Sequence, residues 1–408
     1  HAPRGRSIGG VVVSDRGRAV VLAPMLAARG GAERVALVAA ETLKAAGYDT
    51  VIVAPGQVDD LGAYADYFGI DLDGVAYEEL PSVGRMGRFE ALRTVIEELV
   101  WARIVRSMQP DVFLTCMYGA TLPGLAERSL YYIHFPHQLT TPGLTGLRAR
   151  YVSWTQYARR LQNRGSDFRA TYTSFLANSR FTASHARQRW GVDPYVLYPP
   201  CCGVGAGRVW RQPSILAVGR FQDRQPGHPY KNQEALIVAF RAMADLHAEG
   251  WQLHLAGSVG SEAELARLRE MSVGLPVAFH PNASLEELHT LYRESSVYWH
   301  AQGFGESHLM APQSQEHFGI TTVEAMSAGA IAMVYDTAGP AEVVADAPGT
   351  VRWTSLEELR LATRNIARAD PTDMASLRRA AQRRAAEFSE AAFATRLLTL
   401  IETGSPRS

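Results

Sequence analysis

The chain has 408 residues, which favours two or three domains, and its 47% hydrophobic and 20% charged residues are typical of globular proteins. Lysine plus arginine and aspartate plus glutamate both total 41, so the chain lacks the basic excess of a dedicated nucleic-acid binder. No uncharged apolar run reaches the roughly 18 residues of a membrane span, and three cysteines, two of them adjacent, fit a reducing cytosol better than a disulfide framework.

The first half of the chain predicts a parallel α/β domain. Residues 1–16 are expected to be an N-terminal tail. The apolar run 18–24 predicts a buried strand, 30–48 a helix that ends at Gly47, and 49–55 a second strand. A strand–helix–strand unit of this length implies parallel strands. Further elements are expected in this half: a helix over 90–108, strands over 110–117 and 129–137, and a strand, turn and helix over 174–191.

The second half repeats this alternation after a glycine-rich stretch, 201–214, which is the predicted linker. Strands are expected over 214–220, 251–258, 276–281, 297–303, 330–336 and 349–353. Helices are expected over 232–250, 261–274, 284–295, 319–329, 339–344 and 356–403. Two doubly wound α/β domains in tandem are the simplest interpretation.

Glycines and a histidine are the candidate functional residues of the first half. Gly30 and Gly31 lie between a strand and a helix, where they would let the backbone approach an anionic ligand, although a tight packing turn accounts for them equally well. His134 ends a predicted strand and suits a sugar hydroxyl or a shared proton, while a structural role is the commoner one for a lone histidine. His137 is a weaker candidate.

Two cations of the second half are predicted to converge on one ligand. Arg220 lies at the end of the strand over 214–220, and Lys231 opens the next helix. Both positions point to the crevice where α/β sheets bind ligands. A guanidinium and an ammonium there suit a diphosphate, with two solvated surface cations as the alternative.

The segment "EHFGITTVEAMSAG" predicts a phosphate-binding helix start. Gly319 breaks the chain, and Thr321 or Thr322 is expected to cap the helix. The N–H groups of Ile320, Thr321 and Thr322 are then predicted to point outward, towards a phosphate oxygen.

Carboxylates flank that helix start. Glu316 precedes the turn and Glu324 follows it, so they suit hydroxyl groups of sugar rings on either side of a phosphate. The alternative for a glutamate near a helix start is a favourable interaction with the helix dipole. Asn282 follows the strand over 276–281 and either faces the same crevice or is a plain turn residue; its glycosylation sequon is interpreted as chance.

Several motifs occur together in an order that resembles a known family. They are "GGAERV", "ANSRFTA", "YPP", "VGRF…KNQEALIVAF", "LHLAGS" and "EHFGITTVEAMSAG…GP.EVV". From Arg18 to the C-terminus the chain resembles the retaining GT-B glycosyltransferases of glycosyltransferase family 4. The segments "YIHFPH" and "EHFGITTVEAMSAG" are similar to segments of the α-1,2-mannosyltransferases that extend lipid-linked oligosaccharides, and of their bacterial relatives.

The resemblance implies an α/β fold of two Rossmann-like doubly wound domains facing a central cleft. The tail, 1–16, would precede an N-terminal domain on the acceptor side, 17–205. A C-terminal domain on the nucleotide-sugar donor side, 206–385, would follow. The last helix, 386–408, would return to the N-terminal domain.

The resemblance also implies roles for individual residues. Four residues would be catalytic: His134 beside the donor sugar, Arg220 and Lys231 neutralising the donor diphosphate, and Glu316 holding sugar hydroxyls. Donor binding would also involve Gly30, Gly31, Asn282, the amides of Gly319, Ile320 and Thr321, and Glu324 at the ribose. No metal or other cofactor is expected in this fold, because the cations and the helix dipole neutralise the leaving group.

This chain departs from the family pattern in two places. The stretch "FQDRQPGHPY" between Arg220 and Lys231 is longer than in many relatives, which bears on how Lys231 reaches the ligand. The segment "WHAQGFGESHLMAPQSQ", residues 299–315, precedes Glu316 and is predicted to form a loop over the donor.

The leading hypothesis is a cytoplasmic enzyme that moves a hexose from a nucleotide diphosphosugar to a hydroxyl acceptor with retention. The acceptor would be a saccharide, a lipid-linked glycan or a small molecule. A retaining glycosidase needs a carboxylate pair about 5 Å apart; no obvious pair exists, so a same-face displacement is expected. GDP-mannose is the donor that the resemblance favours, with UDP-sugars close behind.

Two other functions remain open alternatives, a sugar-nucleotide epimerase of the GT-B fold and a non-catalytic sugar-nucleotide binder. A dehydrogenase is disfavoured because no GxGxxG follows the first strand. The helix over 90–108 combines arginines with Trp101. Such a helix suits peripheral contact with the inner membrane face if the acceptor is lipid-linked, or packing against a core.

Overall fold

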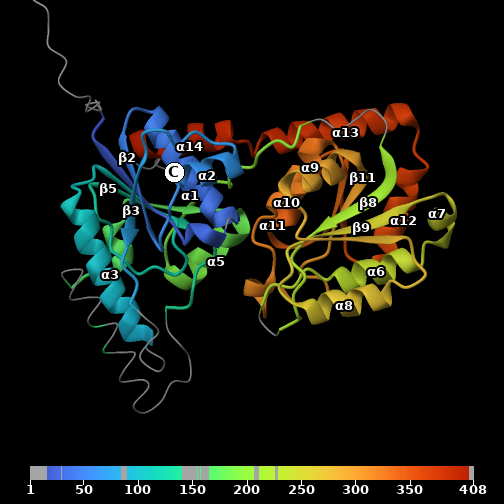
Figure 1. The fold of residues 1–408 in the computed structure, drawn as a ribbon, viewed down its shortest axis with the longest axis horizontal. Coiled ribbons are helices and arrows are strands. Elements are labelled where there is room, and N and C mark those ends of the chain that lie inside the picture. Colours follow the sequence, from blue (N-terminus) through green and yellow to red (C-terminus); the bar gives the residue numbers. More distant parts are fainter. Residues whose placement is uncertain are drawn as a thin grey trace, which may run out of the picture. The chain divides into compact units, whose positions relative to one another are not determined.

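The computed structural model describes residues 16–28, 30–83, 90–139, 154, 157, 165–205, 211–225 and 228–403. The chain divides into two compact units, each built around one sheet (Figure 1). Unit 1 comprises His1–Leu176, Ala186–Tyr195 and Ala394–Ser408. Unit 2 comprises Ala177–His185 and Val196–Phe393.

The first sheet has seven strands in the order β3-β2-β1-β4-β5-β6-β7, and neighbours from β3 to β5 pair in parallel. Its strands are β1 (Arg18–Leu22), β2 (Asp49–Pro55), β3 (Ala76–Leu80), β4 (Val112–Thr115), β5 (Arg128–Ile133), β6 (Ser174–Ala177) and β7 (Tyr195–Val196). Its principal helices are α1 (Gly31–Ala45), α2 (Leu61–Phe68), α3 (Glu90–Ser107), α5 (Arg180–Trp190) and α14 (Glu390–Thr403). The elements α2 and β3 are not predicted from the sequence.

Helix α3 packs one face into the core of unit 1. Trp101, Ala102 and Val105 are buried there, and the indole Nε1 of Trp101 donates to the carbonyl of Pro81 at 2.8 Å. The buried carboxylate of Glu98 accepts hydrogen bonds from the amide and hydroxyl of Thr121 at 2.7 and 2.6 Å. Packing against the core therefore accounts for this face of the helix. Within the described parts of the chain, none of the helices combines the length and apolar character needed to cross a bilayer.

The second sheet has six parallel strands in the order β10-β9-β8-β11-β12-β13. They are β8 (Gln212–Val218), β9 (Gln252–Gly257), β10 (Val277–Pro281), β11 (Ser295–His300), β12 (Ile331–Tyr335) and β13 (Thr350–Trp353). The helices are α6 (Gln233–Arg241), α7 (Ala244–Ala248), α8 (Glu262–Met271), α9 (Leu285–Glu294), α10 (Ile320–Ala328), α11 (Ala338–Val344), α12 (Leu356–Ala367) and α13 (Pro371–Ala386). In chain order this is the 3-2-1-4-5-6 arrangement of the Rossmann fold.

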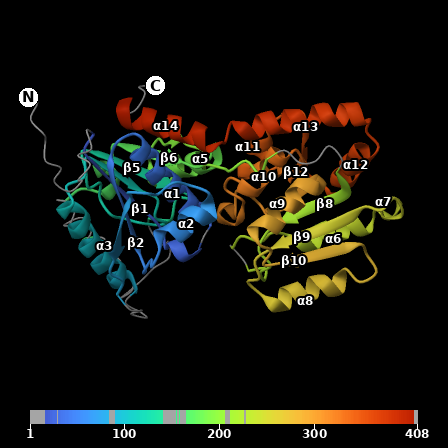
Figure 2. The ribbon, with the colours of Figure 1, turned by 45° about the horizontal axis from the view of Figure 1, so that its top comes forward.

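Alternating strand residues bury both faces of the second sheet. Ile215 and Val297 pack with α6, α8 and α12 on one face, whereas Leu216 and Tyr298 pack with α9, α10 and α13 on the other (Figure 2). A parallel sheet covered on both sides accounts for the nearly continuous apolar runs of its strands in the sequence. The prediction of two Rossmann-like domains is confirmed.

The helix expected over 232–250 is broken in the structure. The backbone of Met243 leaves the helical conformation (φ −117°, ψ 45°) while its side chain is fully buried. The prediction of one continuous helix is therefore wrong, and α6 and α7 replace it. The predicted linker lies partly outside the described residues, since the structure describes 201–205 and resumes at Arg211.

Candidate functional site

The centre of the second sheet is the place where its strand order reverses. Strands β8 and β11 pair there, and the chain between them forms β9 and β10 on the other side of β8. Open α/β sheets bind ligands outside the carboxyl ends of the strands at such a switch point. Arg220 follows β8 by two residues, and His300 is the last residue of β11.

Lys231, Glu316 and His300 meet at this switch point. The Lys231 Nζ lies 2.5 Å from Glu316 Oε2, and the two side chains are 24% and 22% exposed. The Nε2 of His300 lies 3.9 Å from the same carboxylate oxygen, which is too long for a hydrogen bond. Because His300 is only 3% exposed, the three side chains form a cluster that solvent reaches from the Lys231 and Glu316 side.

The charges of this cluster follow from burial and from its neighbours. Burial alone raises the pKa of Glu316, but the Lys231 ammonium and the His300 ring outweigh that effect and hold it well below its usual range. Burial lowers the pKa of His300, although Glu316 opposes the change. At neutral pH Glu316 is therefore a carboxylate and His300 a neutral imidazole. Among the described residues, neither ring nitrogen of His300 has a hydrogen-bond partner.

Glycine at position 219 makes room for Lys231. A Cβ added to Gly219 would lie 2.5 Å from Lys231 Cγ, which is closer than any real contact. The next residue, Asn232, donates from Nδ2 to the carbonyls of Ala301 and Phe304, both at 3.0 Å. These contacts fix the start of α6 and bring Lys231 towards β11.

Arg220 lies at the predicted strand end and is exposed to solvent. Gln233 Nε2 donates to the carbonyls of Gly219 and Arg220 at 3.1 and 3.2 Å, which holds the backbone that carries the guanidinium. Within the described ranges, Arg220 forms no ion pair. Residues 226 and 227 of the long stretch that follows lie outside the described residues.

The start of α10 differs in detail from the prediction. Gly319 is the N-cap with φ 102°, and no side chain caps the helix, so the expected threonine cap is wrong. The amide of Thr322 donates to the Gly319 carbonyl at 3.0 Å, so the prediction that it is free is also wrong. The amides of Ile320 and Thr321 belong to the first turn, which lacks intrahelical acceptors.

The hydroxyls at the start of α10 have different surroundings. Thr321 Oγ1 accepts a hydrogen bond from the hydroxyl of Tyr298 at 2.8 Å. Thr322 Oγ1 is buried and has no hydrogen-bond partner in the part of the chain that the structure describes. A Cβ at Gly319 would lie 3.2 Å from Pro340 Cγ, which accounts for the glycine at this turn together with its positive φ.

Glu324 projects from the second turn of α10. Its Oε2 accepts a hydrogen bond from the hydroxyl of Tyr292 at 2.9 Å, and the side chain is half-buried. Because Tyr292 is fully buried, this bond orients the Glu324 carboxylate.

Asn282 occupies a turn. Its φ is 53°, its amide donates to the Gly257 carbonyl at 2.8 Å, and its Oδ1 accepts from the Val259 amide at 2.9 Å. These bonds hold the loop that follows β9, in agreement with the plain turn role that is one of its two predicted roles.

The candidates of unit 1 lie at the carboxyl ends of its own strands. His134 follows β5, is 8% exposed, and its Nε2 lies 2.9 Å from the Cys116 carbonyl. The ring of Tyr118 lies 4.4 Å from that of His134.

Gly30 caps α1, and its amide donates to Glu33 Oε2 at 2.7 Å, so a carboxylate already occupies that helix start. Gly31 is the first residue of α1.

The segment before Glu316 is anchored at its base. Gln302 Nε2 donates to the Ser314 carbonyl at 3.1 Å, and the hydroxyl of Thr337 donates to Gln315 Oε1 at 3.1 Å. Leu309 and Met310 are 76% and 84% exposed at the other end. That this loop covers a donor stays a prediction.

His300 is the site residue that sequence reasoning missed. His300 is the last residue of an apolar strand, and His134 directly follows one, so the position of a histidine at a strand end could have marked His300 as a candidate site residue. Its carboxylate neighbour is 16 residues further on, in Glu316, and that proximity depends on the fold. The structure thus brings Lys231, Glu316 and His300 together, while His134 and the glycine pair belong to unit 1.

Models of two protein families match the chain. The one described as Glycosyltransferase Family 4 matches residues 29–201, and the one described as Glycosyl transferases group 1 matches residues 211–352.

Curated relatives are distant. The GDP-Man:Man(3)GlcNAc(2)-PP-Dol alpha-1,2-mannosyltransferase of Xenopus laevis is 26% identical over 178 residues, covering 40% of this chain and 34% of that protein. The Neurospora crassa protein of the same name is 25% identical over 361 residues, covering 72% of this chain and 60% of that protein. The chain thus spans about a third of the length of the Xenopus relative.

Solved structures share the fold over nearly the whole chain. A glycosyltransferase from Rickettsia africae has a TM-score of 0.66 at 16% identity, covering 97% of this chain and 100% of that one. Anabaena HepE in complex with UDP and glucose has a TM-score of 0.65 at 15% identity, covering 95% of this chain and 99% of that one. The two family models identify the chain as a glycosyltransferase, with residues 29–201 matching Glycosyltransferase Family 4 and residues 211–352 matching Glycosyl transferases group 1. The solved structures, together with the two Rossmann-like sheets, show that it has the GT-B fold.

Proposed function

We propose that this protein transfers a mannosyl residue from GDP-mannose to a hydroxyl group of a saccharide acceptor, with retention of the anomeric configuration. The names of the curated relatives support the donor and suggest a lipid-linked glycan as the acceptor class. The observation that carries the proposal is the cluster of Lys231, Glu316 and His300 at the switch point of the second sheet.

The charged groups there suit the parts of a nucleotide sugar. Lys231, Arg220 and the first-turn amides of α10 would bind the diphosphate, because cations and a helix N-terminus both favour anions. Glu316 would accept hydrogen bonds from hydroxyls of the sugar. Glu324, oriented by Tyr292, would accept from the ribose.

Donor binding would exchange partners within the cluster. Lys231 and Glu316 neutralise each other at 2.5 Å in this structure. A bound donor would offer phosphate oxygens to Lys231 and hydroxyls to Glu316, so both groups would keep a partner. The neutral ring of His300 would supply an N–H to a group at the same place.

The reaction follows a same-face displacement in this proposal. The bond between the anomeric carbon and the leaving phosphate oxygen breaks, and the acceptor oxygen bonds to the same face of that carbon. The acceptor proton passes to the departing diphosphate, whose charge Lys231 and Arg220 stabilise. No metal takes part in the proposal.

A donor panel tests the proposal. Thermal shifts are measured with GDP-mannose, GDP-glucose, UDP-glucose and UDP-N-acetylglucosamine, and the best binder is incubated with mannosyl saccharides. We expect the largest shift with GDP-mannose, and an α-linked product by NMR. A β-linked product would overturn retention, a larger shift with a UDP-sugar would overturn the donor, and a free 2-epimer without acceptor would indicate an epimerase.

A further inference from the structure

A pocket lies at the other end of the strands of the second sheet, away from the Lys231 cluster. Arg211 precedes β8, Trp251 precedes β9, and Ser296 is the second residue of β11, so the pocket opens at the amino ends of the strands. The Lys231 cluster lies at their carboxyl ends. Because β8 has seven residues, the two places are separated by roughly 20 Å of strand.

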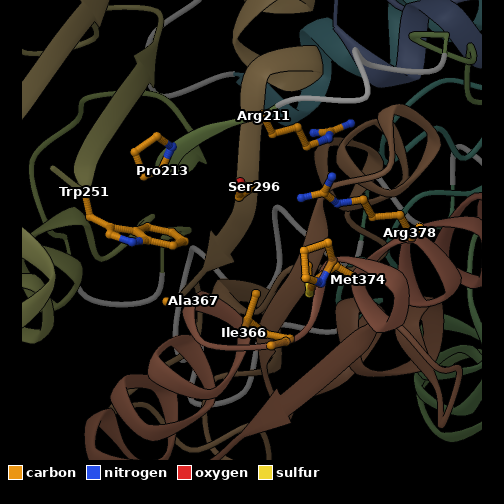
Figure 3. Close-up of a pocket in the computed structure, with 11 residues that line it drawn as sticks. Arg211, Pro213, Trp251, Ser296, Ile366, Ala367, Met374 and Arg378 are labelled. Atoms are coloured by element: carbon orange, nitrogen blue, oxygen red, sulfur yellow. The ribbon is translucent and has the colours of Figure 1, made fainter. Parts of the chain in front are cut away.

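The pocket has an apolar part and a cationic part (Figure 3). Its volume is about 380 Å³, which is within the range of small-molecule sites. Apolar side chains form most of the wall: Pro213, Trp251, Ile366, Ala367 and Met374. The guanidinium groups of Arg211 and Arg378 lie at one end.

Arg211 is held in place without a carboxylate. Its guanidinium donates to the carbonyls of Tyr292, at 3.1 Å, and of Ser295 and Ala328. These carbonyls end helices α9 and α10 and carry partial charge only. Burial, together with the charge of Arg378, lowers the pKa of Arg211 to about 10, so it remains a cation at neutral pH.

Arg378 is the less satisfied of the two. It projects from α13, and its Nε is buried without a hydrogen-bond partner among the described residues. In those same parts of the chain, neither arginine forms an ion pair with a carboxylate. Two neighbouring cations without a counter-charge favour an anion, and the apolar wall favours a ligand that also has an apolar body.

We propose that this pocket binds a phosphate monoester with a small apolar body. The phosphate would lie at Arg378 and Arg211, and a ring or short chain would lie against Trp251 and Ile366. A dianion matches the two uncompensated guanidinium groups. This site does not depend on the donor or acceptor proposed above.

Phenyl phosphate is the probe, and its binding is measured by isothermal titration calorimetry. We expect one site per chain, and weaker binding of inorganic phosphate and of benzyl alcohol, each of which lacks one half of the ligand. Arg378→Gln should weaken binding by about tenfold or more, the range of a charged hydrogen bond. Arg379→Gln is the matched control, because Arg379 is the exposed neighbour on α13 and does not line the pocket.

Two further variants separate binding in this pocket from binding elsewhere on the protein. Ala375→Phe places a bulky side chain in the pocket and keeps both arginines, so it should abolish binding. It therefore tests the pocket independently if Arg378→Gln fails to fold. Lys231→Ala should leave binding unchanged. Equal losses in Arg378→Gln and Arg379→Gln, loss of binding in Lys231→Ala, or no loss in Ala375→Phe would each overturn the proposal.

Discussion

The contact between Lys231 and Glu316 links two residues that the sequence assigns to different parts of one ligand. Their side chains are about three-quarters buried, and although burial alone raises the pKa of Glu316, the contact with Lys231 helps to hold that pKa well below its usual range. The sequence predicts both residues as ligand-binding groups. That they form an ion pair with each other could not be predicted, because 85 residues separate them.

Removing either partner tests whether they act as a unit. Lys231→Met and Glu316→Gln should each lower kcat/KM by about a hundredfold or more, and the double variant should lose much less than the sum of the two in free energy. Steady-state kinetics with the best donor measure this. Arg364→Met, which breaks the ion pair with Asp245, is a control and should keep activity within about twofold. Additive losses would show that the two residues act independently.

A methyl group at position 219 tests the path of Lys231. Gly219→Ala places a Cβ 2.5 Å from Lys231 Cγ, so the lysine must leave its contact with Glu316. We expect donor affinity to fall by about tenfold, since one charged hydrogen bond is lost or misaligned. Gly203→Ala is the control, because nothing lies within 4 Å of the added atom and its φ is not positive. Unchanged donor binding in Gly219→Ala, by calorimetry, would contradict this role.

At the scale of elements, aromatic packing sets the turn that carries Glu316. Phe318 is 3% exposed, and its ring lies 5.8 Å from that of Tyr198 and 5.5 Å from that of Phe388. This anchor fixes the chain between Glu316 and Gly319. The phenylalanine of "EHFG" is therefore a packing residue beside two groups that face the ligand site.

Helix α11 supplies a cap to the start of α5, whose first residues belong to unit 2 as well. The Glu342 carboxylate accepts hydrogen bonds from the amide of Arg180 at 3.0 and 2.8 Å and from the hydroxyl of Tyr198 at 2.7 Å. It thus stabilises the start of α5 through the helix dipole. The motifs "ANSRFTA", "YPP" and "GP.EVV", which lie far apart in sequence, meet in this contact.

Strands β9 and β10 carry a histidine pair whose protonation should weaken the fold. His254 Nδ1 lies 3.0 Å from His280 Nε2, and burial, with His280, lowers the pKa of His254 from 6.5 to about 4. Between about pH 4 and pH 6.5, His254 binds a proton more strongly in the unfolded chain than in the folded protein. Stability is therefore retained above about pH 6.5 and lost as the pH falls towards 4, at up to about 1.4 kcal/mol per pH unit.

Urea unfolding at several pH values between about 4.5 and 7.5 measures this effect. His254→Gln should flatten the pH dependence of the unfolding free energy, whereas His308→Gln, at an exposed position, should leave it unchanged. Parallel curves for the wild type and His254→Gln would exclude this histidine as a source of acid sensitivity.

Buried strands were predictable from sequence, and the exposed edge strand β3 was not. Strands such as β8 and β12 are apolar runs because helices cover both sheet faces. The edge strand β3, "AYEEL", is mostly exposed and contains two glutamates, so no apolar pattern marks it. At the site, Arg220 and Lys231 were predicted from their positions after β8, whereas the role of His300 depends on a neighbour brought by the fold.

At the scale of the whole molecule, each unit has its own sheet and its own core. We therefore expect two transitions in differential scanning calorimetry. All the proposed diphosphate contacts belong to unit 2, so GDP at about a hundred times its Kd should raise one transition by about 5 °C or more and move the other far less. A single transition that shifts as a whole would show that the two units unfold together.

The mutual neutralisation of Lys231 and Glu316 also bears on turnover. In the proposed reaction the sugar leaves with the acceptor, and Glu316 loses the hydroxyls that it held. The Glu316 carboxylate can then pair with Lys231 again at the 2.5 Å distance of this structure. The product nucleotide would no longer be bound by Lys231, which would favour its dissociation. Product inhibition by GDP should consequently be stronger in Glu316→Gln than in the wild type, relative to the affinity of each for the intact donor.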